Sequence, residues 1–452
     1  MKKIGFAIYA PSQLNSFAKS GVLKQLSENL SLSVFVSNNN LLNEIESLGV
    51  PNCKQIKIPL ICRKISGYTQ MVALWRFRER SMNHLVRAMA SFGTKSQQKR
   101  WRCVVVSEMN VSAPKRFLVR VMSNSISFTL LRFIERVILK YFFVTKVRKT
   151  FETIDALCIP FSGHIGADFN ALVFASKEKN VPVFALQENW DNLSTKTFIT
   201  EEPDVFFVWG QQSRGHLRNI HRLFKAKPFI VGSPRFQPYY QDSMPAPIVS
   251  ESNGSQVKLN GISYILIAGT GDGIDDEMLV RTVHEVLLED ISIQDDVKIV
   301  YRPHPASRTK LDLTGMRRDL NRLIIDDGPL SRNFGHHNSL VAHASLVINH
   351  FSTLAIESVI SGTPVVIPLF LGRPEAHYRY EHILNEWHHM MGVGLIPEIS
   401  TPRDIAEFRE ILRALLNGKT LESTPSNIDW ICRKADYSYE IQQAILQILQ
   451  IK

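Results

Sequence analysis

A serine and a threonine, Ser352 and Thr353, stand where a strand-like run, SLVIN, gives way to a helix-like run, LAIESVIS. Hydroxyl groups and free backbone N–H groups at the start of a helix bind anions, and the helix dipole favours negative charge there. Glu357 follows about one turn later, where its carboxylate could accept hydrogen bonds from ribose hydroxyls. The pattern indicates a phosphate and ribose site. The alternative is that Ser352 simply caps the helix and Glu357 is a solvated surface residue.

A cationic loop, YRPHPASR, follows the strand-like run KIVYR. Its cations are Arg302, His304 and Arg308, and Pro305 is one of two prolines that restrict the backbone between them. Cations held with little conformational freedom at the end of a strand suit a phosphate group. A solvated strand edge with a structural histidine is the alternative.

A glycine loop, AGTGDGIDDE, follows the strand-like run SYILI. Gly269 and Gly271 would let the backbone approach a ligand closely, because glycine has no Cβ atom. The spacing differs from the GxGxxG pattern of dinucleotide-binding loops, so a plain turn is an equally good interpretation.

Polar residues crowd around a tryptophan in FALQENWDNLSTK, a segment that begins as a strand. Glu188 and Asp191 are carboxylates that could act as a general base, and Gln187 and Trp190 could contact a substrate beside them. Arg235, in GSPRF, follows a later strand and is the cation expected on the hinge side of this part of the chain. Asp191 could instead cap a helix, since Asp is common in turns.

Strand-like and helix-like segments alternate along most of the 452 residues, a rhythm typical of parallel sheets covered by helices. We therefore expect an α/β protein of two doubly wound, Rossmann-like domains that face each other across a cleft. The expected parts are a first domain over residues 1–240, a Pro- and Ser-rich linker over 241–262, a second domain over 263–435 and a C-terminal helix over 436–452. Ligands of open sheets bind at the carboxyl ends of the strands, where all four motifs are expected.

Positive charge is concentrated in one part of the first domain. The chain has 53 Lys and Arg against 42 Asp and Glu, a net charge of +11, and residues 63–149 alone hold 19 basic and three acidic residues. The segment has no zinc knuckle or RNA-recognition motif, which argues against a nucleic-acid partner. Apolar stretches beside the charge favour an anionic membrane surface, with solvated faces of packed helices as the alternative.

The sequence also bears on location. Residues 125–143 are apolar, but Arg132, Glu135, Arg136 and Lys140 interrupt them at helical spacing, which predicts an amphipathic helix that does not cross a bilayer. Five cysteines without a CxxC pair, and a start that lacks a signal-peptide pattern, are typical of a reducing cytoplasm. We expect a cytoplasmic protein that is peripheral at the inner membrane.

The order of the motifs resembles that of bacterial GT-B glycosyltransferases of surface polysaccharide assembly. The loop around Trp190 comes first, followed by VWG, GSPRF, RPHP and HxST…E…GxPVV, over about residues 155–370. The similarity is greatest to CDP-glycerol glycerophosphotransferases and to capsule transferases that use CMP-activated Kdo or sialic acid. It implies transfer of a sugar from a nucleotide donor, with cytidine preferred, to a glycan or lipid-linked acceptor in capsule or O-antigen assembly. The implied reaction is inverting and needs neither a metal nor another cofactor.

The resemblance also implies residue roles. The family's His-Pro pair matches His304 and Pro305. Its glycerophosphotransferases have Trp-His-Gly in the first-domain loop, with the histidine as base, whereas this chain has Trp-Asp-Asn at positions 190–192. The difference favours a sugar transferase with Asp191 as the base, and Glu188 as second choice, over a polyol-phosphate transferase.

The expected site residues fall into three groups. The catalytic group is Asp191, Glu188 and His304. The donor-binding group is Arg302, His304, Pro305, Arg308, Ser352, Thr353, Glu357, Gly269 and Gly271. The acceptor-binding group is Gln187, Trp190 and Arg235. Two other classes stay open: a UDP-sugar 2-epimerase-like enzyme on the same fold, and a non-catalytic scaffold of a glycan assembly complex.

Overall fold

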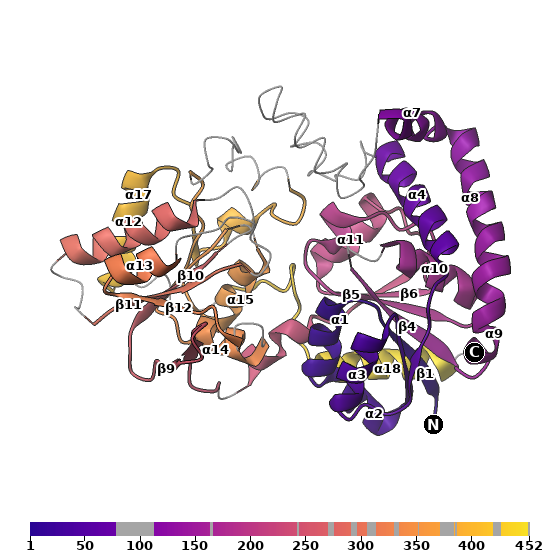
Figure 1. Ribbon diagram of the computed structural model, residues 1–452, viewed down its shortest axis with the longest axis horizontal. Helices are drawn as coiled ribbons and strands as arrows, with labels where there is room; N and C mark the ends of the chain where they lie inside the picture. Colours follow the sequence, from indigo (N-terminus) through magenta and orange to yellow (C-terminus); the bar gives the residue numbers. More distant parts are fainter. Residues whose placement is uncertain are drawn as a thin grey trace. The chain divides into compact units, whose positions relative to one another are not determined.

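The computed structural model describes residues 1–77, 113–162, 166–241, 244–269, 275–290, 296–304, 313–329, 334–350, 352–370, 384, 387–418 and 426–450. They form two compact units, each built on a parallel sheet with helices around it (Figure 1). In the described chain the first unit comprises residues up to Gln237 together with the C-terminal residues from Asp429, and the second comprises Pro238–Ile428. The expected pair of doubly wound α/β domains is confirmed.

The first unit has a seven-stranded sheet in the order β3-β2-β1-β4-β5-β6-β7, and all neighbours are parallel. The strands are β1 (Lys3–Ile8), β2 (Ser31–Val36), β3 (Cys53–Gln55), β4 (Ala156–Phe161), β5 (Val183–Gln187), β6 (Val205–Val208) and β7 (Lys227–Ile230). The central strands are apolar and buried on both faces, as a sheet covered by helices requires. The strand order reverses between β1 and β4, which is where ligands bind in folds of this kind.

Helices cover both faces of this sheet. They are α1 (Pro11–Gln13), α2 (Val22–Asn29), α3 (Asn39–Ser47), α4 (Leu60–Arg76), α7 (Ala113–Met122), α8 (Ser125–Leu139), α9 (Thr145–Phe151), α10 (Gly166–Lys177), α11 (Gln211–Asn219) and α18 (Tyr437–Gln450). The C-terminal helix α18 packs on this unit, where Tyr437 and Ile441 join Phe17 in the core. The chain before α18 passes so close to Gly210 that a Cβ atom there would lie 2.5 Å from the carbonyl oxygen of Ile431.

The second unit has a six-stranded parallel sheet in the order β12-β11-β10-β13-β14-β15. Its strands are β10 (Tyr264–Ala268), β11 (Lys298–Arg302), β12 (Leu323–Ile325), β13 (Leu346–Ile348), β14 (Val365–Val366) and β15 (Ile399–Ser400). Its helices are α12 (Asp276–Glu289), α13 (Leu313–Asp319), α14 (Phe334–Ala342), α15 (Thr353–Ser361) and α17 (Ile405–Leu416). The strand order reverses between β10 and β13.

The expected linker, residues 241–262, contains regular structure in its described part. Strands β8 (Ile248–Ser250) and β9 (Gln256–Lys258) form an antiparallel hairpin. The backbone N–H of Ser250 donates to Asp326 Oδ1 over 3.0 Å, and Val249 is buried in the core of the second unit. The hairpin is therefore part of the second unit. Its apolar strand β8 packs on that unit, although the residues around it in the sequence are mostly polar.

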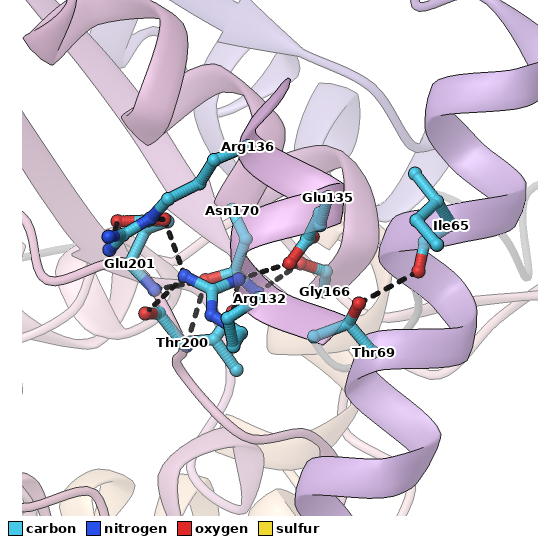
Figure 2. A network of polar contacts seen from close by, with 9 residues as sticks. All are labelled: Ile65, Thr69, Arg132, Glu135, Arg136, Gly166, Asn170, Thr200 and Glu201. Atoms are coloured by element: carbon cyan, nitrogen blue, oxygen red, sulfur yellow. Dashed lines mark hydrogen bonds and ion pairs between the residues drawn. The ribbon is translucent and has the colours of Figure 1, made fainter. Parts of the chain in front are cut away.

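The described part of the basic segment, residues 63–77 and 113–149, is helical. Helices α4, α7 and α8 pack around Val72, Val119 and Leu131, and α8 runs beside α4 and α10 on the outside of the first unit (Figure 1). Figure 2 shows how α8 is anchored: Arg132 contacts Glu135 on its own helix and Glu201 in the loop before β6. Among the described residues, no helix combines the length and apolar character needed to cross a membrane.

Candidate functional site

Glu188 directly follows β5, at the carboxyl edge of the first sheet. Its side chain is only 6% exposed, and burial raises the pKa of Glu188 to about 7. The hydroxyls of Ser12 and Ser162 oppose this shift in the pKa, Asp191 adds to it, and Arg235 opposes it. Ser12 lies in the chain after β1 and Ser162 directly after β4, so Glu188 sits where the strand order reverses.

The chemistry available at Glu188 is proton transfer near neutral pH. A carboxyl group with a pKa of about 7 is present in both forms there, as an efficient general base or acid should be. Its Oε2 atom makes no hydrogen bond to any residue that the structure describes. Nothing in the sequence motifs pointed to Ser12 or Ser162; the available signal was that each follows an apolar strand.

Gln187 and Trp190, expected on the acceptor side, are each 1% exposed and shape the loop around Glu188. The Gln187 amide donates from Nε2 to the backbone oxygens of Asn189 (3.1 Å) and Trp190 (3.3 Å), and its Oε1 accepts from the N–H of Trp209 (3.1 Å). The Trp190 indole N–H donates to Gln212 Oε1 over 2.9 Å. Both residues therefore help to position the loop, because their polar atoms bond within the protein, and their expected contact with the acceptor stays a prediction.

Asp191 and Arg235 lie beside Glu188 but are less buried. Asp191 is the N-cap residue of a π-helical turn, Asn192–Lys196, as the alternative expected, but its side chain makes no capping hydrogen bond. Arg235 lies in a 3₁₀ helix, Pro234–Tyr240, and its Nη1 donates to Asn189 Oδ1 over 3.4 Å. The carboxyl edge of the first sheet thus carries two carboxylates and a cation.

In the second unit, Arg302 ends β11 next to a buried carboxylate that the motifs had missed. Asp326 is 0% exposed and follows β12; its Oδ1 lies 2.9 Å from His336 Nε2, and its Oδ2 lies 3.6 Å from Arg302 Nε. The sequence signal for Asp326 was a strand-like run that ends in two aspartates, RLIIDD. Asp326 therefore holds the cationic end of β11 in place.

A polar chain connects Arg302 to Glu357. The Arg302 guanidinium contacts His337 Nδ1. A guanidinium only donates, so Nδ1 accepts. The Nε2 atom of the same ring lies 3.2 Å from Glu357 Oε2 but makes no hydrogen bond within the described part of the chain. The Tyr239 hydroxyl donates to the same oxygen over 2.9 Å. Glu357 is 0% exposed, so the alternative that it is a solvated surface residue is wrong, and its carboxylate contacts protein groups.

The remaining donor-side residues lie at or near strand ends of the same unit. Ser352 is the N-cap of α15, with its Oγ accepting from the N–H of Leu354 over 3.2 Å, and Thr353 is the first residue of that helix. The Gly269 N–H donates to the carbonyl of Arg302 over 2.8 Å. His304 is exposed just after β11. The predicted donor residues Pro305, Arg308 and Gly271 lie outside the described residues.

At the start of α15 the N–H groups of Leu354 and Ala355 both donate to Ser352, to its Oγ and to its carbonyl oxygen, each over 3.2 Å. Burial lowers the pKa of His350, just before α15, to about 3, so this histidine is neutral at physiological pH. Among the described residues, no cluster of three or more His, Cys, Asp or Glu side chains is arranged to hold a metal ion.

The two doubly wound units define a fold of the GT-B type. No protein-family model and no curated protein sequence matches the chain. Solved structures do. A UDP complex of S. aureus MnaA is 12% identical and covers 100% of this chain and 98% of its own, with a TM-score of 0.54. A Listeria monocytogenes protein assigned as a UDP-N-acetylglucosamine 2-epimerase gives the same values. The UDP-GlcNAc 2-epimerase of Methanocaldococcus jannaschii is 11% identical, with complete coverage of both chains and a TM-score of 0.50. At these identities the similarity establishes the fold.

Proposed function

We propose that this protein is a glycosyltransferase that moves a sugar from a nucleotide-activated donor to a glycan or lipid-linked acceptor. A cytidine nucleotide, as in CMP-Kdo- or CMP-sialic-acid-like donors, is the preferred leaving group, and the pathway is assembly of a surface polysaccharide such as capsule or O-antigen. The observation that carries the proposal is Glu188, a buried carboxyl with a pKa of about 7 at the sheet edge where such folds bind ligands. The GT-B fold, which also occurs in a protein solved with UDP, supports a nucleotide sugar as the ligand class.

The first unit is assigned the activation of the acceptor. Glu188 takes the proton of the acceptor hydroxyl as that oxygen bonds to the anomeric carbon of the donor sugar. Burial and pKa favour Glu188 over Asp191, which was the first choice on sequence grounds. Asp191 then helps to raise the pKa of Glu188, and Arg235 orients the substrate as the nearby cation.

The second unit is assigned the donor phosphate. As the bond between the anomeric carbon and the phosphate oxygen breaks, the oxygen keeps the electron pair. Arg302 and His304 stabilise the negative charge that forms on it, together with Ser352, Thr353 and the N-terminus of α15. Attack on the face opposite the leaving group inverts the anomeric configuration. Glu357 has an indirect role: it lies against His337, which contacts Arg302, and so helps to position the Arg302 guanidinium.

A UDP-sugar 2-epimerase is the second candidate, and one observation favours it: two solved structures described as UDP-GlcNAc 2-epimerases share the fold, at TM-scores of 0.54 and 0.50. An epimerase would also use a carboxyl group of raised pKa to move a proton. The two reactions differ in that an epimerase converts its nucleotide sugar without an acceptor, whereas a transferase needs one.

The test is a nucleotide panel followed by a reaction without acceptor. The purified protein is melted in the presence of CMP-, CDP-, UDP- and GDP-sugars, and we expect a CMP-sugar to raise the melting temperature most. The stabilising sugar is then incubated alone and with a mixture of glycans and lipid-linked acceptors. A glycosylated product contradicts the epimerase, and conversion of UDP-GlcNAc without acceptor contradicts the transferase. No stabilisation by any nucleotide would leave the scaffold of a glycan assembly complex as the better account.

A further inference from the structure

One surface of the first unit concentrates exposed apolar side chains. Of the twenty large hydrophobic side chains exposed among the described residues, ten lie between Phe117 and Phe142, on α7, α8 and the π-helical turns Lys140–Val144. Five of these recur at spacings of four and three and so lie along one side of α8 and its continuation; we call them the apolar stripe: Ile126, Leu130, Phe133, Val137 and Tyr141. Phe133 is 63% exposed and Ile126 83%.

The opposite face of α8 buries Leu131 and Leu139 together with one charged side chain, that of Glu135. Glu135 is 1% exposed and contacts Arg132, which also contacts Glu201 in the loop before β6 (Figure 2). Arg136 Nε lies 2.9 Å from Glu201 Oε1 and completes this network. An amphipathic helix on the surface of a protein in water normally buries its apolar residues, whereas α8 buries only some of them. The buried leucines and the ion pairs together anchor α8, while its apolar stripe faces outward.

The rim of the apolar stripe is basic. Between Ala113 and Lys149 the sequence has nine Lys and Arg and a single acidic residue, Glu135, which is buried. Exposed cations along α7, α8 and α9 are Arg120, Arg136, Lys140, Lys146, Arg148 and Lys149. Acidic groups from outside the three helices reach some of them: Glu178 lies 3.2 Å from Lys140, and Glu152 lies 2.8 Å from Arg148. Positive charge nevertheless exceeds negative charge around the stripe.

We propose that the apolar stripe of α8 inserts into the interface of an anionic lipid bilayer, with the helix lying in the plane of the membrane. An exposed apolar face combined with a basic rim is the pattern of interfacial helices, whose apolar side enters the acyl boundary while cations meet anionic headgroups. The basic residues around the apolar stripe complement anionic headgroups, which favours an anionic bilayer over an uncharged apolar partner. The inference stands on this surface alone and does not depend on the proposed transfer reaction.

Vesicle flotation with the full-length protein tests the inference. Phosphatidylcholine vesicles with and without one quarter phosphatidylglycerol are compared at moderate salt, and the anionic vesicles should bind the protein more strongly. The double variant Leu130→Ser, Phe133→Ser should bind them roughly tenfold more weakly, since it removes two apolar side chains from the inserted face. The matched control is Phe224→Ser, Leu288→Ser, because these side chains are exposed to a similar extent, 68% and 56%, but lie elsewhere. It should bind within about twofold of the unchanged protein.

Three results would overturn the inference: no binding to anionic vesicles, equal binding to neutral and anionic vesicles, or unchanged binding by the Leu130, Phe133 variant. Sedimentation equilibrium is run in parallel. A dimer that this variant breaks, without vesicle binding, would show that the stripe contacts a second copy of the chain. Thermal shift by nucleotide sugars is measured on every variant, so that a failure of lipid binding can be told apart from a failure of the proposed activity.

Discussion

The Tyr239 hydroxyl donates to Oε2 of Glu357 over 2.9 Å, and the Nε2 atom of His337 lies 3.2 Å from the same oxygen. These two contacts hold a carboxylate that is fully buried in the second unit. The Tyr239 bond also connects the first residues of this unit to α15, at whose start the donor-side hydroxyls of Ser352 and Thr353 lie. The folding of the unit and the shape of its candidate site therefore depend on the same contacts.

Tyr239→Phe removes the hydroxyl and leaves the ring. Because a hydrogen bond to a buried carboxylate is worth about 1.5 to 3 kcal/mol, we expect the free energy of unfolding to fall by that amount. Urea denaturation measures it. Tyr439→Phe is the control, since Tyr439 is 58% exposed, and it should change stability by less than about 0.5 kcal/mol. Equal effects of the two variants would remove the argument for the Tyr239 bond.

Glu188→Gln should lower kcat about 10² to 10⁴-fold if Glu188 is the base, because the amide cannot accept the proton. In the unchanged protein kcat/KM should rise with pH through about 7, as Glu188 loses its proton. Asp191→Asn should move this rise to lower pH and Arg235→Gln to higher pH, since Asp191 raises and Arg235 lowers the pKa of Glu188. Shifts in the same direction for both variants would contradict the electrostatic assignment.

The raised pKa of Glu188 also predicts that the free energy of unfolding falls as the pH rises. The folded protein holds the Glu188 proton more tightly than the unfolded chain, whose glutamates have a pKa of 4.5, so this contribution to stability is complete below pH 4.5 and is lost as the pH rises through about 7. Glu188→Gln removes this loss of stability, because the amide does not ionise. The variant should match the unchanged protein near pH 4.5 and exceed it at pH 8 by at most about 3 kcal/mol. Urea denaturation at both pH values measures the difference, and a variant less stable at pH 8 would refute it.

Gly269 packs too closely for a side chain. A Cβ atom there would lie 2.9 Å from Asp276 Oδ2 and 3.0 Å from the Tyr301 hydroxyl, so we expect Gly269→Ala to destabilise the protein by about 1 to 3 kcal/mol and to weaken nucleotide binding. Gly67→Ala is the control. Gly67 lies inside α4 with open space around its Cα, so alanine should stabilise by about 0.5 to 1 kcal/mol. Thermal unfolding of both variants decides; a stabilising Gly269→Ala would contradict the close approach.

His304→Ala should reduce transfer without a large change in stability, because the side chain is exposed. His343→Ala is its matched control, since His343 is exposed near the far end of α14 and is assigned no role in the reaction. Initial rates with a matched donor and acceptor measure the effect. A fully active His304→Ala would remove this residue from the donor site.

Local features of the site could be predicted because they depend on neighbours in the chain. Ser352 was expected before a helix, and it is the N-cap of α15. Glu188 and Asp191 were both expected after a strand, and both follow β5. Features that depend on strand order were missed: Ser12 and Ser162 approach Glu188 only because β1 and β4 are neighbours in the sheet. The contact of Arg302 with His337 spans 35 residues and leaves no periodic trace in the sequence.

The amino-acid sequence alone determined the α/β class, the two doubly wound domains, the strand-end position of the polar motifs and the concentration of charge in residues 63–149. Alternating apolar runs and caps encode such features locally. Only the tertiary structure decided that Glu188 is more deeply buried than Asp191, that Glu357 is enclosed by Tyr239 and His337, and that α8 buries Glu135 while its apolar stripe stays exposed. Burial and pairing are properties of the packed elements together, since they depend on which distant residues meet, and a periodicity in one segment does not contain them.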